Sequence, residues 1–323
     1  MSVNWMRVLR FIANMKQQRL ISHAVTPETI DIISKKISGR IKQQGDKPYC
    51  TIAQQLDLLD QLTQFDLGRY LLQNQGVNGY WTHYFLTHPW FGRKTGKNNR
   101  GEPLSKLEKF LLDKSPVLLA TQQRFEIFLK ENQQQVKDHA KLACIPCGMM
   151  GELLYLDYHN IGNIELVGID YDLNTFNDAQ DLAKKQNLTK FIKLIQQDAW
   201  HLSFENEFDL ISSNGLNIYE PDDSKVTELY RQFYKALKPG GKLVTSFLTF
   251  PPHLTQQCEW DLSKINQQDL LLQKIIFVDI IEAKFQCYRS TEQTRAQLAE
   301  VGYRDIEFIY DEAKIFPTVV TYK

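Results

Sequence analysis

The alternation of short apolar runs with amphipathic segments after about residue 141 constrains the fold more than any other feature of the sequence. Helical patterns separate the runs; in 224–237, for example, apolar residues recur at steps of three and four. Strands that alternate with helices form a parallel sheet, because right-handed crossovers place the helices on both of its faces. We therefore predict a doubly wound α/β sheet. Its first five strands are 142–145, 164–170, 191–195, 208–212 and 243–248.

The end of the chain departs from this alternation. A helical pattern over 291–300 precedes two apolar runs, 305–310 and 318–322, and the link between these runs contains Pro317. The link is too short for a crossover helix, so the two strands must pair antiparallel. The sequence thus predicts a Rossmann-like, doubly wound seven-stranded sheet with a C-terminal antiparallel strand.

The first 140 residues have helical periodicity and no convincing strand. Helices are predicted over 51–65 and 121–139, and between them lies an aromatic-rich loop, 76–103, that Gly and Pro punctuate. A chain of 323 residues is more than one core usually fills. The domains that we predict are 1–140, an all-helical lid, and 141–323, the sheet domain with a helical insertion at about 250–287.

Composition excludes several classes of protein. Lys and Arg number 38, as do Asp and Glu, so the formal net charge is zero and no basic excess favours nucleic acid. No apolar run approaches the roughly 20 residues of a membrane span. The best stretch, 275–281, carries Asp279 at its centre. We predict neither nucleic acid as a partner nor a membrane span.

The N-terminus is basic, since Arg7, Arg10, Lys16 and Arg19 precede the first acidic residue, Glu28. An organelle transit peptide is one interpretation of this segment. Its apolar stretch is interrupted and too short for a signal-peptide core, so we predict a basic amphipathic helix instead. The five cysteines, an odd number, do not suggest a secreted disulfide framework. We therefore predict a cytoplasmic protein.

Four polar or glycine-bearing segments fall where predicted strands end, the edge at which α/β sheets bind ligands. Glycines in the turn 145–151 let a backbone approach a ligand closely. Asp170 could accept hydrogen bonds from a ribose diol. Asp198 could accept one from an exocyclic amine beside the flat wall of Trp200, and 212–219 is a polar turn. Each segment alone could be an ordinary turn or helix cap, but their coincidence at four strand ends predicts one ligand crevice.

Two motifs carry a family resemblance: Phe208-Asp-Leu-Ile211 and, after it, Leu237-Lys-Pro-Gly-Gly-Lys-Leu243. Together with the glycine turn, the strand-terminal acids and the terminal pair, they make residues 141–323 resemble the class I S-adenosylmethionine-dependent methyltransferases. The resemblance implies methyl transfer from S-adenosylmethionine to a small-molecule acceptor. The cofactor-binding residues that it implies are Pro146, Cys147, Gly148 and Met149 beside methionine and ribose, Asp170 with Tyr171 at the ribose, Asp198, Ala199 and Trp200 at the adenine, and Ser213 and Asn214 near the reacting methyl.

The glycine turn departs from that family's pattern. The family's three alternate glycine positions fall on Pro146, Gly148 and Met150, and only the middle one is glycine. Read from Pro146 to Gly151, the turn is closer to the dinucleotide fingerprint with its first glycine lost, and Asp170 suits both readings. An NAD(P)-linked oxidoreductase is therefore an alternative. A non-catalytic interaction module that keeps a degenerate cofactor fold is another.

Cysteines and histidines offer two further patterns. Cys144 and Cys147 form a Cys-x-x-Cys sequence, which can be a redox pair. Here Cys144 lies inside a predicted strand that should bury it, so we do not expect redox chemistry. His83 and His88 have no nearby acid or cysteine cluster in the sequence, so we predict no metal site.

Two segments could cover a substrate: 76–91 and the insertion around Trp260. Six aromatic residues and two histidines in the first segment would suit a flat or apolar molecule, although they could equally pack the helical half onto the sheet. Tyr219 and His83 are candidate bases if the acceptor must lose a proton. Arg124 could bind the cofactor's carboxylate or be an ordinary surface arginine. The predicted substrate residues are Tyr80, Trp81, His83, Tyr84 and Tyr219.

Overall fold

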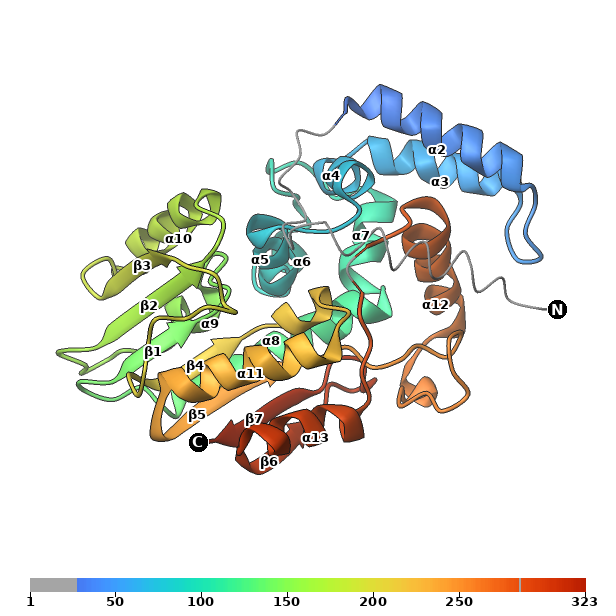
Figure 1. Cartoon of the computed structure of the whole chain (residues 1–323). Helices are drawn as coiled ribbons and strands as arrows, with labels where there is room; N and C mark the ends of the chain where they lie inside the picture. The colour runs from blue at the N-terminus through green and yellow to red at the C-terminus, as the bar shows by residue number, and fades with distance from the viewer. Residues whose placement is uncertain (1–27, 285) are drawn as a thin grey trace.

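The computed structural model describes residues 28–284 and 286–323, so the basic amphipathic helix predicted near the N-terminus lies outside the described residues. Figure 1 shows a group of helices beside a twisted sheet that has helices on both of its faces. Within the two described ranges, no helix combines the length and the apolar character needed to cross a membrane.

The N-terminal part is helical, as predicted. Thr51 begins one of its helices with a capping box, in which its side chain accepts from the backbone N–H of Gln54 and the Gln54 side chain accepts from the backbone of Thr51. The described helices of this part are α2 (Ile30–Gln44), α3 (Ile52–Thr63), α4 (Asp66–Asn74), α5 (Gly79–Thr87), α6 (Gly92–Thr95), α7 (Lys106–Asp113) and α8 (Pro116–Gln133).

The prediction of a loop over 76–103 is wrong, because the helices α5 and α6 lie within these residues. Asn78 caps α5, and its side chain accepts a hydrogen bond of 3.1 Å from the N–H of Trp81. Apolar and aromatic residues occupy most positions of α5, so no helical period stands out in the sequence. The helix predicted over 121–139 is displaced, since α8 begins at Pro116, a residue favoured at the first helical position.

The sheet has seven strands in the order β3-β2-β1-β4-β5-β7-β6. All neighbouring pairs are parallel except those of β7, which runs antiparallel to both β5 and β6. The predicted C-terminal antiparallel pair is therefore confirmed. The strands are β1 (Lys141–Cys144), β2 (Glu165–Asp170), β3 (Ile192–Gln196), β4 (Phe208–Ser213), β5 (Leu237–Ser246), β6 (Arg304–Ile309) and β7 (Thr318–Tyr322).

The Lys-Pro-Gly-Gly motif lies inside β5, which starts six residues earlier than predicted. Leu237 pairs with Phe208, and the register between the two strands shifts before the next pair. A Cβ atom at Gly241 would lie 2.9 Å from the carbonyl oxygens of both Phe208 and Lys238. The strand is therefore irregular at this motif, and only glycine fits at position 241.

Helices cover both faces of the sheet (Figure 1). On one face α8, α9 and α10 pack through residues such as Phe128, Leu153 and Ala179. On the other face α11 and α13 pack through Phe233 and Leu298. The helices that connect the strands are α9 (Gly151–Leu154), α10 (Asn174–Lys185), the 3-10 helix η1 (Leu216–Tyr219), α11 (Asp223–Ala236) and α13 (Thr291–Val301).

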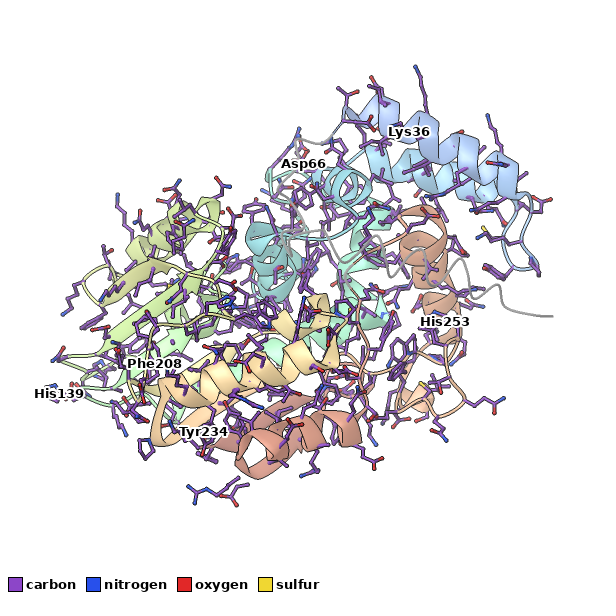
Figure 2. All side chains as sticks on the ribbon, viewed as in Figure 1. Lys36, Asp66, His139, Phe208, Tyr234 and His253 are labelled. Carbon is purple, nitrogen blue, oxygen red and sulfur yellow. The ribbon has the colours of Figure 1, made fainter. Side chains whose placement is uncertain are left out.

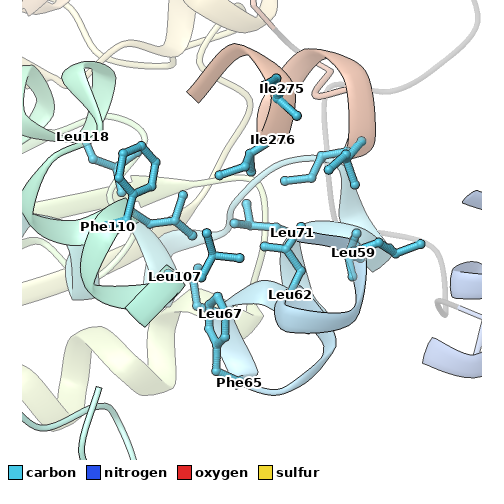
Figure 3. Close-up of a cluster of buried hydrophobic side chains, with 14 of the residues drawn as sticks. Leu59, Leu62, Phe65, Leu67, Leu71, Leu107, Phe110, Leu118, Ile275 and Ile276 are labelled. Atoms are coloured by element: carbon cyan, nitrogen blue, oxygen red, sulfur yellow. The ribbon is translucent and has the colours of Figure 1, made fainter. Parts of the chain in front are cut away.

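The insertion after β5 packs on the N-terminal helices. It contains η2 (Leu262–Lys264), α12 (Gln267–Lys274) and a π-helical segment, η3 (Ile275–Ile280). Figure 3 shows Ile275 and Ile276 beside leucines of the N-terminal helices. Two segments that lie far apart in the chain thus share one apolar core. The domain boundary at about residue 140 stays a prediction.

A buried ion pair joins α8 to the sheet. Lys242, in β5, is fully buried, and its Nζ lies 2.8 Å from Oε2 of Glu131. The same ammonium donates to the carbonyl oxygen of Glu131 at 2.9 Å and to Oε1 of Gln134 at 3.0 Å. All three donors of the lysine are thereby used, so the charge is compensated despite its burial.

We expect Glu131→Ala to lower the free energy of unfolding by about 3–5 kcal/mol, because it leaves the charge of Lys242 buried without its partner. Urea unfolding followed by circular dichroism measures the loss. The double variant Glu131→Leu/Lys242→Met removes both charges and should recover most of the stability. Equal losses in the single and double variants would contradict this role of the pair.

Candidate active site

The glycine turn and the acid at the end of β2 are hydrogen bonded to each other. The backbone N–H of Gly148, a residue with φ of +46°, donates to Oδ2 of Asp170 at 3.1 Å. The other oxygen, Oδ1, accepts from the N–H of Asp172 at 3.0 Å. A carboxylate oxygen can accept more than one hydrogen bond, so Asp170 can shape the turn and also accept from a ligand.

Met150 occupies a position where the family's pattern has a glycine. Its side chain fits in the core beneath the turn. Its φ is +57°, and its side chain is fully buried among apolar residues on the sheet. A Cβ atom at Gly168 of β2 would lie 2.7 Å from the Met150 sulfur. Gly168 therefore leaves the room that the methionine fills. The side chain therefore belongs to the core beneath the turn.

The two cysteines of this turn are unsuited to redox chemistry. Cys144 is fully buried with its Sγ 3.5 Å from Oε2 of Glu152, and Cys147 is buried with its Sγ 3.9 Å from Oγ1 of Thr175. Burial raises the pKa of both thiols well above the usual value. A redox cysteine needs an accessible thiolate, and these thiols stay protonated.

Asp198 lies at the same edge of the sheet as Asp170. Residues 170 and 196 pair across β2 and β3, and the N–H of Gln197 donates to the carbonyl oxygen of Asp170 at 3.0 Å. The Asp198 carboxylate accepts from the N–H of Trp200 at 3.0 Å and lies 2.9 Å from Nδ1 of His201. Asp198 therefore shapes a turn, and with 42% of its side chain exposed it remains accessible to a ligand.

The residues around Asp198 form part of the same edge. Nε1 of Trp200 donates to the carbonyl oxygen of Lys225 at 2.8 Å, which fixes the indole beside α11. Ala199 is buried, whereas Tyr171, just after β2, is 45% exposed. Gly148, Asp170 and Asp198 thus follow three neighbouring strands, β1, β2 and β3, at their carboxyl ends. The predicted convergence of strand-terminal residues is present.

At the end of β4, a buried carboxylate that the sequence analysis missed orients Asn214. Nδ2 of Asn214 donates to Oε1 of Glu152 at 2.6 Å. The neighbouring Ser213 is buried, and its carbonyl oxygen accepts from Oγ1 of Thr245 at 3.0 Å. Glu152 is the second residue of the four-residue helix α9, and no sequence pattern distinguishes it from a surface acid.

Arg124 is a buried cation, which excludes the interpretation as a surface arginine. Only 5% of it is exposed, its Nη1 donates to Oγ of Ser246 at 3.2 Å, and its guanidinium lies 4.4 Å from the centre of the Phe316 ring. Burial lowers the pKa of Arg124 to about 10, so it is still charged at neutral pH. Burial also raises the pKa of Tyr219, against an opposing effect of Arg124, so the Tyr219 phenol is protonated at neutral pH.

A cavity of about 420 Å³ adjoins the ends of β4 and β5. Its walls come from α4, α5, α8, η1, the segment after β5, the inserted helices and the segment before β7. The predicted site residues that line it are Arg124, Asn214 and Tyr219. Trp260 of the insertion also lines it, as expected for a segment that covers a substrate.

The other predicted substrate residues lie outside the lining of this cavity. Trp81 is buried in the helical core and contacts Tyr84 edge to face at 5.4 Å. The Tyr84 hydroxyl donates to Oε1 of Glu108 at 3.1 Å, and Tyr80 is 38% exposed. The residues of α5 that do line the cavity are Thr82 and Phe85. Because a loop was predicted for this segment, the sequence did not show which face of α5 points into the cavity.

His83 packs between helices and does not line the cavity. Its Nε2 lies 2.8 Å from the Tyr155 hydroxyl, and the two rings stack at 5.7 Å. Burial lowers the pKa of His83 to about 4, so the ring is neutral at pH 7. For this residue the structure agrees with the packing interpretation. Throughout the described ranges, no group of three or more His, Cys, Asp or Glu side chains could hold a metal ion.

The N-terminal helices cover the glycine turn directly. A Cβ atom at Gly79, the first residue of α5, would lie only 3.1 Å from Cα of Gly148. From α4, the buried Tyr70 hydroxyl approaches Tyr219 and Asp172, and burial raises the pKa of Tyr70 to about 12 with smaller contributions from those two residues. The turn is therefore enclosed between the sheet and the helices.

Three buried polar atoms near these groups have no hydrogen-bond partner among the described residues. They are the Tyr70 hydroxyl, Nε of Arg124 and Oδ1 of Asn214. Buried polar atoms in proteins are nearly always paired, so polar groups of a ligand could pair with these three atoms. Nε of Arg124 is a charged donor, which suits a carboxylate. Oδ1 of Asn214 is an acceptor, which suits an ammonium or hydroxyl group.

Comparisons with known proteins agree with this geometry. A methyltransferase-domain family matches residues 144–241. The demethylmenaquinone methyltransferase of Lactobacillus johnsonii is 28% identical over 117 residues, which span 36% of this chain and 46% of that protein. The chain thus matches about half the length of this curated relative. Residues 144–241 thus match a methyltransferase domain, and the strand order and the strand-end residues agree with a class I enzyme that uses S-adenosylmethionine as its cofactor.

A solved structure resembles nearly the whole chain. It is that of a possible exported protein from Bordetella parapertussis, 42% identical, with a TM-score of 0.84. The alignment covers 91% of this chain and 95% of that chain. The N-terminal helices and the insertion are therefore shared with this relative, along with the sheet.

We expect Gly79→Ala to weaken the binding of S-adenosylhomocysteine by about 1–3 kcal/mol, the usual cost of overpacking, because the new methyl group would push α5 away from the Gly148 backbone. Isothermal titration calorimetry measures the change. Gly39→Ala is the matched control, since a Cβ atom there meets nothing within 4 Å. Equal affinities for the two variants would show that α5 does not constrain the cofactor turn.

Proposed function

We propose that this protein transfers a methyl group from S-adenosylmethionine to a small-molecule acceptor bound in the cavity beside β4. The hydrogen bond between Gly148 and Asp170 carries the proposal, since it joins a turn that permits close backbone approach to an acid suited to a ribose diol. The adjoining cavity, of about 420 Å³, has the usual size of a small-molecule site.

The cofactor would extend along the carboxyl ends of the strands. Asp170 would accept from the ribose hydroxyls, and Asp198 from the adenine amine with Trp200 as a flat wall. Arg124 would bind the carboxylate of the methionine part, since its charge is buried and its Nε has no partner in the described ranges. Asn214, fixed by Glu152, would lie near the methyl group.

Most of the catalytic contribution of the chain would be orientation and exclusion of water. The cofactor supplies a methyl group already activated on a sulfonium sulfur. The acceptor's nucleophilic atom must be held in line with that group, which the cavity walls achieve by restricting its position. We assign no base: His83 lies outside the cavity, and Tyr219 is protonated and can only donate at neutral pH. The cytoplasmic location and the lack of a nucleic-acid partner stay predictions.

We expect the protein to bind S-adenosylhomocysteine and not NADH. Asp170→Ala should weaken that binding by about 1.5–3 kcal/mol, the usual value of hydrogen bonds to a charged group. Calorimetry with both ligands measures this. Binding of NADH alone would favour the oxidoreductase, and binding of neither would favour the non-catalytic module.

Asp138→Ala is the control for the structural role of Asp170. Asp138 also accepts two backbone N–H groups, from Gly162 at 2.8 Å and Asn163 at 3.1 Å, but it lies before β1, away from the ligand edge. Loss of affinity in both variants would mean that a general loosening of turns, and no ribose contact, explains the effect of Asp170→Ala.

Arg124→Met should reduce the affinity for S-adenosylhomocysteine by about 1.5–3 kcal/mol and leave that for 5′-methylthioadenosine nearly unchanged. The second ligand has the same nucleoside and sulfur but no carboxylate, so it does not need the arginine. Competition binding with the two ligands measures the difference. An equal loss for both would place the Arg124 charge away from the cofactor's carboxylate.

A further inference from the structure

The charged residues that line the cavity are all positive. They are Arg124, Lys274 and Lys284. Burial lowers the pKa of His253, the histidine of the lining, so this side chain is neutral at pH 7. No Asp or Glu belongs to the lining, all of which lies in the described part of the chain. A cavity lined by cations and by no carboxylate has a positive potential, which favours an anionic ligand.

The cations other than Arg124 lie on the inserted segment, away from the sheet. Lys274 ends α12, and its Nζ donates to the Tyr49 hydroxyl at 2.8 Å, which leaves two of its three donors for other partners. Lys284 follows η3 and is exposed. Figure 2 shows His253 in the loop beside α12, on the side of the molecule away from β2 and β3.

Two acids of this segment are already engaged, Glu282 by an ion pair with Arg40 and Asp279 by two other residues. Oδ1 of Asp279 lies 2.7 Å from Nζ of Lys47, and its Oδ2 accepts from the Tyr49 hydroxyl at 3.2 Å. Asp279 does not line the cavity. It therefore compensates Lys47 first, and the two lining lysines keep a net positive charge at this end.

The rest of the wall is mainly apolar, and several of its polar groups are occupied by the protein. Oε1 of Gln273 accepts from Oγ of Ser115 at 2.7 Å and from the N–H of Val117 at 2.8 Å. Oγ1 of Thr121 donates to the carbonyl oxygen of Val117 at 2.8 Å. The apolar lining includes Phe85, Ile218, Leu270, Phe277 and Tyr288. Such a wall suits the body of an apolar ligand.

From this distribution we propose that the methyl acceptor is an amphipathic anion. Its apolar body would fill the cavity, its acidic group would lie near Lys274 and Lys284, and its nucleophilic atom would lie at the other end, beside Asn214. The proposal rests on the proposed function in taking the bound anion as the acceptor. Arg124 is reserved for the cofactor, so the acidic group is assigned to the lysines of the insertion.

Three probes of equal chain length test the charge preference: decanoate, 1-decanol and decylamine. Each is titrated by calorimetry into the full chain saturated with S-adenosylhomocysteine. We expect decanoate to bind at least roughly tenfold more tightly than decanol, and decylamine more weakly than decanol, because an ammonium would meet the lysine charges.

The double variant Lys274→Met/Lys284→Met keeps the apolar stems and removes both charges. It should lose roughly tenfold in affinity for decanoate and keep its affinity for decanol, since tenfold corresponds to about 1.4 kcal/mol of charge interaction. Lys109→Met, an exposed lysine of α7 outside the lining, is the matched control and should change neither affinity.

The outcomes separate this inference from the proposed function. Equal binding of decanoate and decanol, a preference for decylamine, or no binding of any probe overturns the inference, even where S-adenosylhomocysteine binds. An unchanged decanoate affinity in the double variant overturns the role of the lysines. Failure of S-adenosylhomocysteine to bind overturns the proposed function, whatever the probes do.

Discussion

The hydrogen bond from the Gly148 N–H to the Asp170 carboxylate is the interaction on which the candidate site depends. It joins the turn after β1 to the end of β2. A glycine backbone that a ligand can approach closely and a strand-terminal acid therefore lie at one edge of the sheet. Parallel strands make this arrangement possible, because all of their carboxyl ends lie on the same side of a sheet. The end of β3 joins the same edge through the bond from Gln197 to Asp170.

The second constraint is the enclosure of that edge by distant parts of the chain. α5 presses Gly79 against Gly148, and α8 brings the buried Arg124 to the end of β5. The insertion after β5 shares its core with the N-terminal helices and completes the cavity wall. The strand-end edge thus lies near a cavity that is mainly apolar and carries positive charges.

The sequence predicted that Asp170 and Asp198 lie at strand ends, but it did not predict which residues of α5 line the cavity. Asp170 and Asp198 were recognisable in the sequence because each acid comes at the end of an apolar run. In an α/β fold such a run is a strand, so the acid lies at the edge of the sheet. The segment with Trp81 and His83 was not recognised as a helix, because its many aromatic residues hide the helical periodicity. Which of its side chains point into the protein depends on the elements that pack against it. No sequence pattern singled out Glu152 or Lys274. Only their burial and their partners in the folded structure distinguish them from other charged residues.

The sequence by itself determined the alternation of strands and helices, the antiparallel end and the strand-terminal acids, because these follow from local periodicity and short connections. Only the tertiary structure decided which side chains meet in the cavity and which charges stay unbalanced there. That depends on contacts between segments such as α8 and α12, which lie far apart in the chain, and no local pattern records such contacts. Packing between distant elements therefore sets the lining of the cavity.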